Sequence, residues 1–286
     1  MKNALLWVAA LALALAAAPL AAREPIRIGW TAWADGVFVT RLAARIIEAE
    51  LDQPVELVRA GIAEQYQGVA SGRLDAMLMS WQPQTHGPYI RRVAGRAEDL
   101  GALYTGGRLG WAVPAYAPRD VIASIADLDS AGVRERLDGR ITGIEPASGL
   151  MRLSRRAVDA YGLEDYTLEP GGGPAMGKAL TRAIEANEWI VVTAWSPHWM
   201  FAAFDLRYLE DERGILGGSE RIHALARPGF HADHPAVAEL LGRIWLPQAE
   251  LEAALLDAHE DSTTAAVDRY LEAHPDRIAY WVSGDH

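Results

Sequence analysis

The sequence predicts an α/β protein with two lobes, because strand-like and helix-like patterns alternate in two separate series. The first series starts at residue 26 and the second at about residue 140. The apolar run over residues 74–81 is nearly continuous, which is typical of a parallel strand covered on both faces. Two crossings, at residues 111–114 and 211–219, would carry the chain out of the first lobe and back. We expect a mainly parallel sheet flanked by helices in each lobe, with a ligand cleft between the lobes.

The elements of the first lobe follow from hydrophobic periodicity. Phe38, Leu42 and Ile46 recur at i+4, so residues 37–51 are expected to form a helix with one buried face. The other elements expected here are strands at residues 26–30, 55–58, 74–81 and 108–114, and a helix at 63–70.

The second lobe shows the same alternation. Leu150, Leu153 and Ala157 share one face of a helix predicted over residues 148–161, and Pro174 suits the first turn of the next helix. The strands expected here are at residues 140–144, 166–168 and 189–194, followed by a return strand at 222–226 and a helical tail from 235 that is broken at Pro247 and Pro275. We therefore place lobe one at residues 23–112 plus 216–286 and lobe two at 113–215.

The N-terminus is expected to be a secretory signal peptide over residues 1–22. Lys2 precedes an apolar run at residues 4–18, and small and then polar residues follow. An uncleaved membrane anchor is the alternative, but the run is short for a span, which needs roughly 20 residues.

Composition limits location and partners. The chain has no Cys, so it uses no disulfide and lacks the residue that anchors a bacterial lipoprotein. We expect a free, monomeric protein in the periplasm. The net charge of −11 argues against nucleic-acid binding, which needs clustered Lys and Arg.

Three tryptophans occupy similar positions, each at or just after the carboxyl end of a predicted strand. They are Trp33, Trp81 and Trp195, the first two in lobe one and the third in lobe two. Ligands of open α/β sheets bind beyond such strand ends, although a single Trp there usually serves packing. If the lobes face each other, three indoles meet in one cleft, and Trp is the strongest cation–π partner for a quaternary ammonium group.

An anion site is predicted on the facing side. Residues 143–149 lead from a strand into a helix, whose N-terminal amides favour negative charge. Gly143 allows close backbone approach, and His86 adds a side-chain donor. A cation cage beside an anion site matches a betaine, a zwitterion with a quaternary ammonium group and a carboxylate.

Several long motifs resemble those of the substrate-binding proteins of ABC transporters for glycine betaine and related osmoprotectants. The matching stretches are residues 80–86 (SWQPQTH), 107–114 (GRLGWAVP), 143–146 (GIEP) and 192–201 (VTAWSPHWMF), within a likeness that runs from residue 26 to about 284.

The resemblance implies a type II periplasmic binding protein fold that closes on its ligand. It implies a cage of Trp33, Trp81 and Trp195, and a carboxylate site made by His86 and the amides of Gly143 and Ile144. It also implies transient docking of the closed form on a membrane permease driven by an ATPase. No cofactor and no metal are expected.

Three alternatives stay open. The Gly-Trp-Thr at residues 29–31 resembles choline-binding relatives, so Trp30 could replace Trp33 in a protein that prefers choline or carnitine. An exported enzyme acting on a small amine would need a nucleophile, and we find no motif for one. His231 and His234 are spaced like metal ligands, but no acidic or Cys partner accompanies them.

Overall fold

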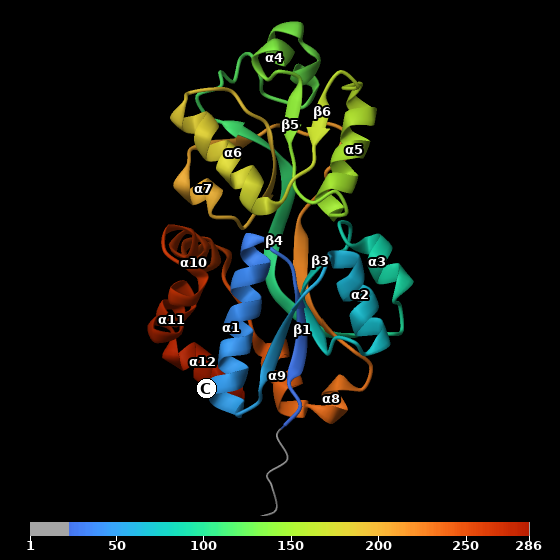
Figure 1. Ribbon diagram of the computed structural model, residues 1–286, viewed down its shortest axis with the longest axis vertical. Coiled ribbons are helices and arrows are strands. Elements are labelled where there is room, and N and C mark those ends of the chain that lie inside the picture. The colour runs from blue at the N-terminus through green and yellow to red at the C-terminus, as the bar shows by residue number, and fades with distance from the viewer. Residues whose placement is uncertain (1–22, 286) are drawn as a thin grey trace, which may run out of the picture.

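The computed structural model describes residues 23–285, so the predicted signal peptide lies outside the described residues. The chain folds into two α/β lobes stacked along the long axis of the molecule (Figure 1). The α/β architecture with two lobes is thus confirmed. The lobes share one nine-stranded sheet with the order β2-β1-β3-β9-β4-β7-β5-β6, and β8 pairs with β4 beside this path.

The sheet of lobe one begins with parallel strands. Strand β1 (Ile26–Trp30) pairs in parallel with both β2 (Val55–Arg59) and β3 (Ala76–Gln82). The return strand β9 (Glu220–Ala226) then runs antiparallel to β3. Six of the seven residues of β3 are buried, as expected for a strand covered on both faces.

Helices cover both sides of this sheet. Helix α1 and the C-terminal helices lie on one side, and α2 and α3 lie on the other (Figure 1). The helices of lobe one are α1 (Ala34–Leu51), α2 (Ile62–Ser71), α3 (Gly87–Arg92), α8 (Phe230–Asp233), α9 (Pro235–Arg243), α10 (Gln248–Glu260), α11 (Thr263–Ala273) and α12 (Pro275–Ser283). The predicted breaks at Pro247 and Pro275 fall between helices of this tail.

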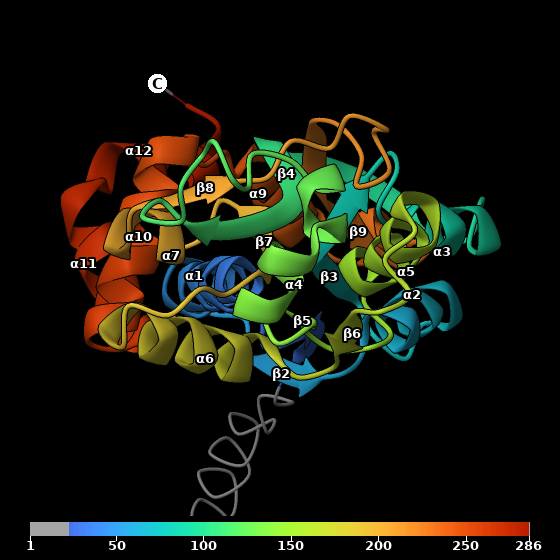
Figure 2. The same cartoon turned by 90° about the horizontal axis from the view of Figure 1, so that it is seen from above.

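Lobe two is smaller and is built around short strands (Figure 2). Its strands are β5 (Arg140–Thr142), β6 (Thr167–Glu169), β7 (Val192–Ser196) and β8 (Leu206–Tyr208), and its helices are α4 (Ala131–Arg136), α5 (Gly149–Tyr161), α6 (Gly173–Glu185), α7 (Met200–Ala203) and the 3₁₀ helix η1 (Ala126–Asp129). β5 pairs in parallel with β6 and β7, so β7 ends at the cleft between the lobes.

One long strand joins the lobes. Strand β4 (Glu98–Pro114) pairs with β9 up to Gly107 and with β7 from Arg108 onward. The change of partner comes a few residues before the expected lobe boundary at residue 112. The first half of this strand was not predicted, because three register shifts against β9 interrupt its alternating pattern.

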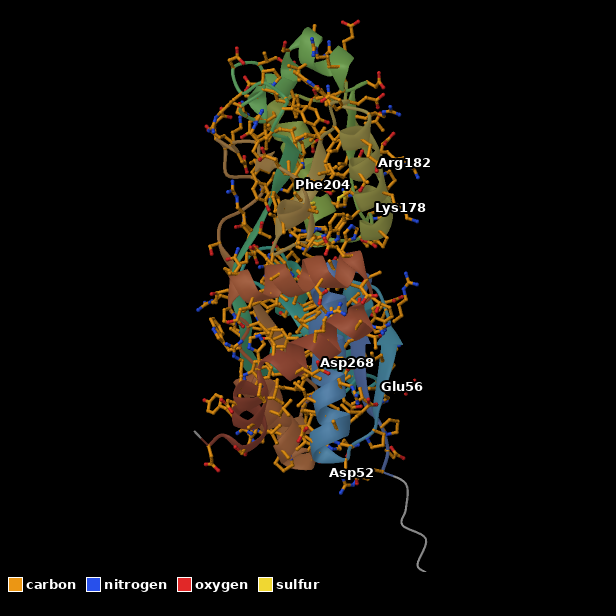
Figure 3. All side chains as sticks on the ribbon, turned by 90° about the vertical axis from the view of Figure 1, so that its left-hand side faces the viewer. Asp52, Glu56, Lys178, Arg182, Phe204 and Asp268 are labelled. Atoms are coloured by element: carbon orange, nitrogen blue, oxygen red, sulfur yellow. The ribbon has the colours of Figure 1, made fainter. Side chains whose placement is uncertain are left out.

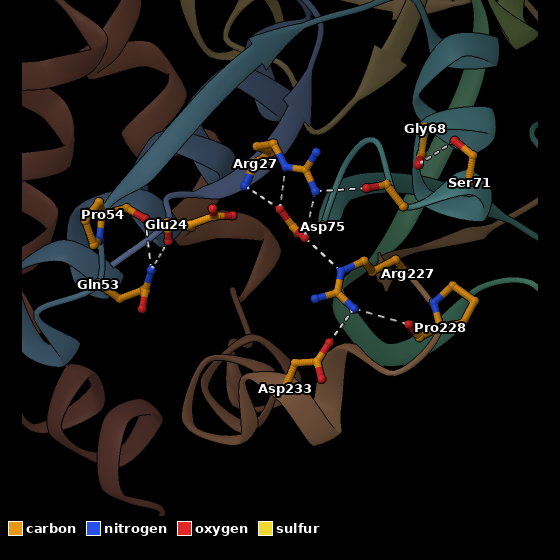
Figure 4. A network of polar contacts seen from close by, with 11 residues as sticks. Glu24, Arg27, Gln53, Pro54, Gly68, Ser71, Asp75, Arg227, Pro228 and Asp233 are labelled. Carbon is orange, nitrogen blue, oxygen red and sulfur yellow. Dashed lines mark hydrogen bonds and ion pairs between the residues drawn. The ribbon is translucent and has the colours of Figure 1, made fainter. Parts of the chain in front are cut away.

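A buried charged network ties three strand ends of lobe one together (Figure 4). Asp75, which is 5% exposed, accepts hydrogen bonds from the backbone and guanidinium of Arg27 and from Arg227 Nε. Burial alone would raise the pKa of Asp75, but the bonds from the two arginines hold it below its usual value. The network therefore fixes β1, β3 and β9 at the end of the lobe far from the cleft.

We expect Asp75→Ala to lower the free energy of unfolding by about 2 kcal/mol, because two guanidinium groups lose their shared acceptor. Denaturant unfolding measures this change. The control is Asp268→Ala, whose carboxylate pairs with Arg45 on the surface and should contribute less than about 1 kcal/mol. Equal effects of the two variants would contradict a special role for Asp75.

Candidate functional site

The three predicted cage tryptophans lie at the ends of three different elements, where the two lobes meet. Trp33 is the residue before α1, Trp81 lies near the end of β3, and Trp195 lies near the end of β7. Their exposed fractions are 7%, 3% and 3%. The structure brings all three together around one enclosed space between the lobes.

That space is a small cavity with an almost entirely apolar lining. It is lined by Trp33, Trp81, Thr85 and His86 from lobe one, by Leu109 of β4 where that strand pairs with β7, and by Ile144, Ser148, Gly149, Leu150 and Trp195 from lobe two. Five of the six predicted site residues therefore line one cavity, and Gly143 does not.

Gly143 has a structural role in place of the expected one. Its N–H donates to the carbonyl of Glu169 at 2.9 Å, which extends the pairing of β5 with β6. A Cβ added there would lie 2.4 Å from Sδ of Met151. Gly143 is thus required by close packing behind the cavity, and its amide is not free for an anion.

Free amides lie instead at the first turn of α5. Ser148 is the N-cap, and its Oγ accepts from the amide of Met151 at 3.1 Å. Among the described residues, no acceptor is recorded for the amides of Gly149 and Leu150, which line the cavity. The sequence carried a signal for this position, because a Ser directly before Gly149 marks the helix start and the first amides of a helix lack internal partners.

His86 is buried and neutral. Its Nδ1 accepts a hydrogen bond from the backbone N–H of Trp81 at 3.1 Å. Burial, assisted by the positive charge of Arg152, lowers the pKa of His86 to about 3. The ring also hydrogen-bonds to the backbone of Met79, which partly opposes this shift. A neutral imidazole carries one N–H donor, and the His86 ring lines the cavity.

The indole N–H groups of the cage are occupied by acceptors of the protein. Trp81 Nε1 donates to Sδ of Met79 at 3.2 Å. Trp33 Nε1 donates to Oε2 of Glu145 at 2.9 Å, and Trp195 Nε1 donates to Oδ1 of Asp35 at 3.1 Å. The rings consequently offer the cavity carbon edges and π faces, with no N–H left to donate.

The lobes are closed on each other around this cavity. Arg152 of α5 donates to the carbonyl of Thr85 at 2.8 Å, and Tyr89 of α3 donates to the carbonyl of Ala147 at 2.9 Å. On the far side of the cavity, the rings of Trp199 and His259 stack at 3.5 Å between centroids. Contacts between residues far apart in the chain thus hold the lobes together beside the cavity.

Two other tryptophans, Trp30 and Trp111, lie outside the cavity. Trp30 does not line the cavity, and the guanidinium of Arg59 lies 5.8 Å from the centre of its ring. Trp111 is fully buried in lobe two, where its indole donates to Ser154 at 2.9 Å. Trp33 is accordingly the tryptophan of this segment that reaches the cavity.

Residues 23–285 contain neither a metal-binding cluster nor a helix suited to cross a membrane. Within this range, no group of three or more His, Cys, Asp and Glu side chains is arranged to hold a metal ion. Within the same range, no helix combines the length and the apolar character needed to cross a membrane.

The chain is similar to known transport proteins. The family described as the substrate-binding domain of the ABC-type glycine betaine transport system matches residues 24–273. The glycine betaine/carnitine transport binding protein GbuC of Listeria monocytogenes is 31% identical over 153 residues, which are 52% of this chain and 51% of GbuC. The match therefore spans about half the length of that curated relative.

Solved structures cover nearly all of the described chain. Lactococcal OpuAC, in a closed-liganded form with glycine betaine, is 30% identical with a TM-score of 0.83 and covers 91% of this chain and 100% of its own. The glycine betaine/L-proline-binding protein ProX of Borrelia burgdorferi is 27% identical with a TM-score of 0.84 and covers 91% and 97%. The type II fold expected from the sequence is confirmed by these similarities.

We expect acid to destabilise the protein through two buried histidines, His86 and His198. Burial lowers the pKa of His198 to about 3, as it does for His86. In the unfolded chain both return to about 6.5, so the unfolded state binds more protons below that pH. Their contribution is present above pH 6.5 and falls by about 2 kcal/mol for each histidine between pH 7 and pH 5.

Denaturant unfolding at pH 7 and pH 5 measures this loss. The matched variants are His86→Asn and His198→Asn, since the Asn oxygen can replace the Nδ1 acceptor of each ring. Each variant should flatten the dependence on pH by about half. An unchanged slope would show that these histidines are not the groups that take up protons.

Proposed function

Because the chain belongs to the family of substrate-binding domains of ABC-type glycine betaine transport systems, we propose that it captures glycine betaine or a closely related quaternary-ammonium zwitterion. The observation that carries the proposal is the closed apolar cavity with three indoles from two lobes. Delivery to an ABC permease in the cytoplasmic membrane, residence in the periplasm after removal of residues 1–22, and action as a monomer belong to the same proposal.

The cage suits a methylated cation for a chemical reason. A trimethylammonium group has no N–H, so carboxylates and carbonyls cannot hydrogen-bond it. Aromatic faces meet both its methyl groups and its charge, and each desolvated contact contributes roughly 2 kcal/mol. Three indoles whose N–H groups are already occupied present such surfaces and little else.

The carboxylate end of the ligand has matching donors. We propose that it accepts from the amides of Ile144, Gly149 and Leu150 and from the ring N–H of His86, while the amide of Gly143 is occupied by the carbonyl of Glu169. The amides lie at the positive end of α5, which has 13 residues and favours an anion at its first turn. A neutral His86 donates one hydrogen bond there without adding charge.

Choline is the weaker candidate ligand, because its neutral hydroxyl would be a poorer hydrogen-bond acceptor than a carboxylate for the two amides of α5. Catalysis is a still weaker candidate function. The hydroxyl of Ser148 caps α5, and the hydroxyl of Thr85 donates to buried Glu220, so the two hydroxyl side chains lining the cavity already have structural partners.

We expect Trp195→Ala to weaken glycine betaine binding by about 2 kcal/mol, or roughly 30-fold, with little effect on the unliganded fold. Calorimetry and intrinsic Trp fluorescence measure the affinity, and thermal melting checks the fold. Trp245→Ala is the matched control, since this tryptophan is 45% exposed and lies outside the cavity. The proposal fails if the unaltered protein gives no heat with glycine betaine, proline betaine, choline or carnitine.

We expect Gly149→Ala to oppose closure. In the closed structure the added Cβ would lie 2.5 Å from Cγ2 and 2.8 Å from the carbonyl oxygen of Thr85 in the facing lobe. Affinity should fall at least tenfold, and small-angle scattering should show less compaction on adding glycine betaine. Gly132→Ala is the control, because nothing lies within 4 Å of its added Cβ. Wild-type affinity in the Gly149 variant would contradict this site.

A further inference from the structure

Two walls of the cage are joined across the cleft in a reciprocal way. Trp33 belongs to lobe one and donates to Glu145 of lobe two at 2.9 Å. Trp195 belongs to lobe two and donates to Asp35 of lobe one at 3.1 Å. Each lobe thus supplies one indole donor and one carboxylate acceptor, and neither bond can exist unless the lobes are together.

Asp35 is fixed before the lobes meet. It is fully buried in the first turn of α1, and its Oδ2 accepts from the hydroxyl of Tyr104 at 2.7 Å. The next residue, Gly36, packs so closely on Met79 that an added Cβ would lie 2.7 Å from its methyl carbon. The acceptor for Trp195 is therefore held by contacts within lobe one.

Glu145 is placed by a different kind of constraint. It lies in the turn between β5 and α5, where its carbonyl accepts from the amide of Ser148 at 2.9 Å. Its side chain is partly buried against Gly172, with Oε1 3.3 Å from the position of an added Cβ there. The carboxylate can then reach Trp33 as the lobes close.

These bonds have two consequences for the cage. They fix how the two indoles are turned, because the N–H edge of each ring points at its carboxylate. They also place a carboxyl group at the edge of each ring. The bond from Trp33 to the Glu145 carboxylate is charge-assisted, and such bonds are stronger than neutral ones, whereas burial raises the pKa of Asp35 and favours its neutral form. Negative charge beside a ring strengthens its attraction for a cation on the π face.

We propose that Asp35 and Glu145 are positioning residues that lock Trp195 and Trp33 across the cleft, and that the charge of Glu145 makes the closed cage select a positively charged occupant. The inference rests on the proposed function and deepens it. The two carboxyl groups act through the indoles and do not themselves touch the ligand. Closure thereby involves both hydrogen bonds, and charge selection involves the one from Trp33 to Glu145.

The test compares two ligands of the same shape. Glycine betaine and 3,3-dimethylbutanoate share the carboxylate and the three methyl groups, but the second carries carbon in place of the charged nitrogen. The ratio of their affinities isolates the recognition of charge. In Asp35→Asn and Glu145→Gln, the remaining amide oxygen still accepts from the indole. Glu145→Gln removes a negative charge, whereas Asp35→Asn replaces a group whose neutral form burial favours.

We expect glycine betaine to bind about tenfold more weakly to Glu145→Gln, with the affinity for 3,3-dimethylbutanoate unchanged or higher, so that the ratio falls about tenfold. Asp35→Asn, which keeps the acceptor of Trp195, should change the ratio less. The control Asp268→Asn removes the same charge from α11, well away from the cavity (Figure 3), and should leave the ratio unchanged. Thermal melting checks that the variants fold. If Asp35→Asn does not fold, the Glu145→Gln variant alone tests the inference, because Glu145 is only partly buried.

The outcomes separate this inference from the proposed function. In Glu145→Gln, a parallel loss of both ligands, or an unchanged ratio, would overturn the charge-selecting role while the binding function stands. Failure of the unaltered protein to bind glycine betaine would overturn the proposed function itself. A fall in the ratio in Glu145→Gln, without a fall in the Asp268 control, supports the inference.

Discussion

The architecture depends on one constraint, which is that a methylated cation cannot be held by hydrogen bonds. Flat apolar faces must surround it, and a single sheet edge presents such faces from one side only. The chain meets this need by ending β3 and β7, from different lobes, at the same cavity and adding Trp33 before α1. The long strand β4 joins the two lobes within one sheet, so the walls of the cage meet when the lobes meet.

The same constraint explains the unusual polar groups around the cavity. Unpaired polar atoms in an apolar space are costly, and the donors of the cage are occupied by acceptors behind it. His86 is kept neutral by burial and accepts from the backbone of Trp81, so no uncompensated charge is added. Among the described residues that line the cavity, the backbone amides of Ile144, Gly149 and Leu150 have no acceptor.

The sequence predicted the parts that follow from local pattern. Strand ends marked by Trp followed by a turn located the three indoles without knowledge of the contacts between lobes. The sequence predicts the anion site at Gly143, because a strand end with glycine suits an anion. In the structure the Gly143 amide pairs with β6, whereas the amides of Gly149 and Leu150 at the start of α5 have no acceptor among the described residues. Such pairing depends on residue 169, and the bonds of Asp35 and Glu145 span more than a hundred residues, so no local pattern could reveal them.

Energetics decide which contacts control closure. A hydrogen bond within a protein contributes about 0.5–1.5 kcal/mol net, because water competes for the same groups in the open form. The few bonds that cross the cleft are thus comparable with the cost of ordering their side chains. A cation in contact with three indoles adds roughly 6 kcal/mol that is available only when both lobes surround it. By population shift, a ligand with this difference in affinity converts a weakly biased pair of lobes into a closed one. Under the proposed function, the interlobe bonds then determine which ligand fits, and the ligand determines whether the lobes stay closed.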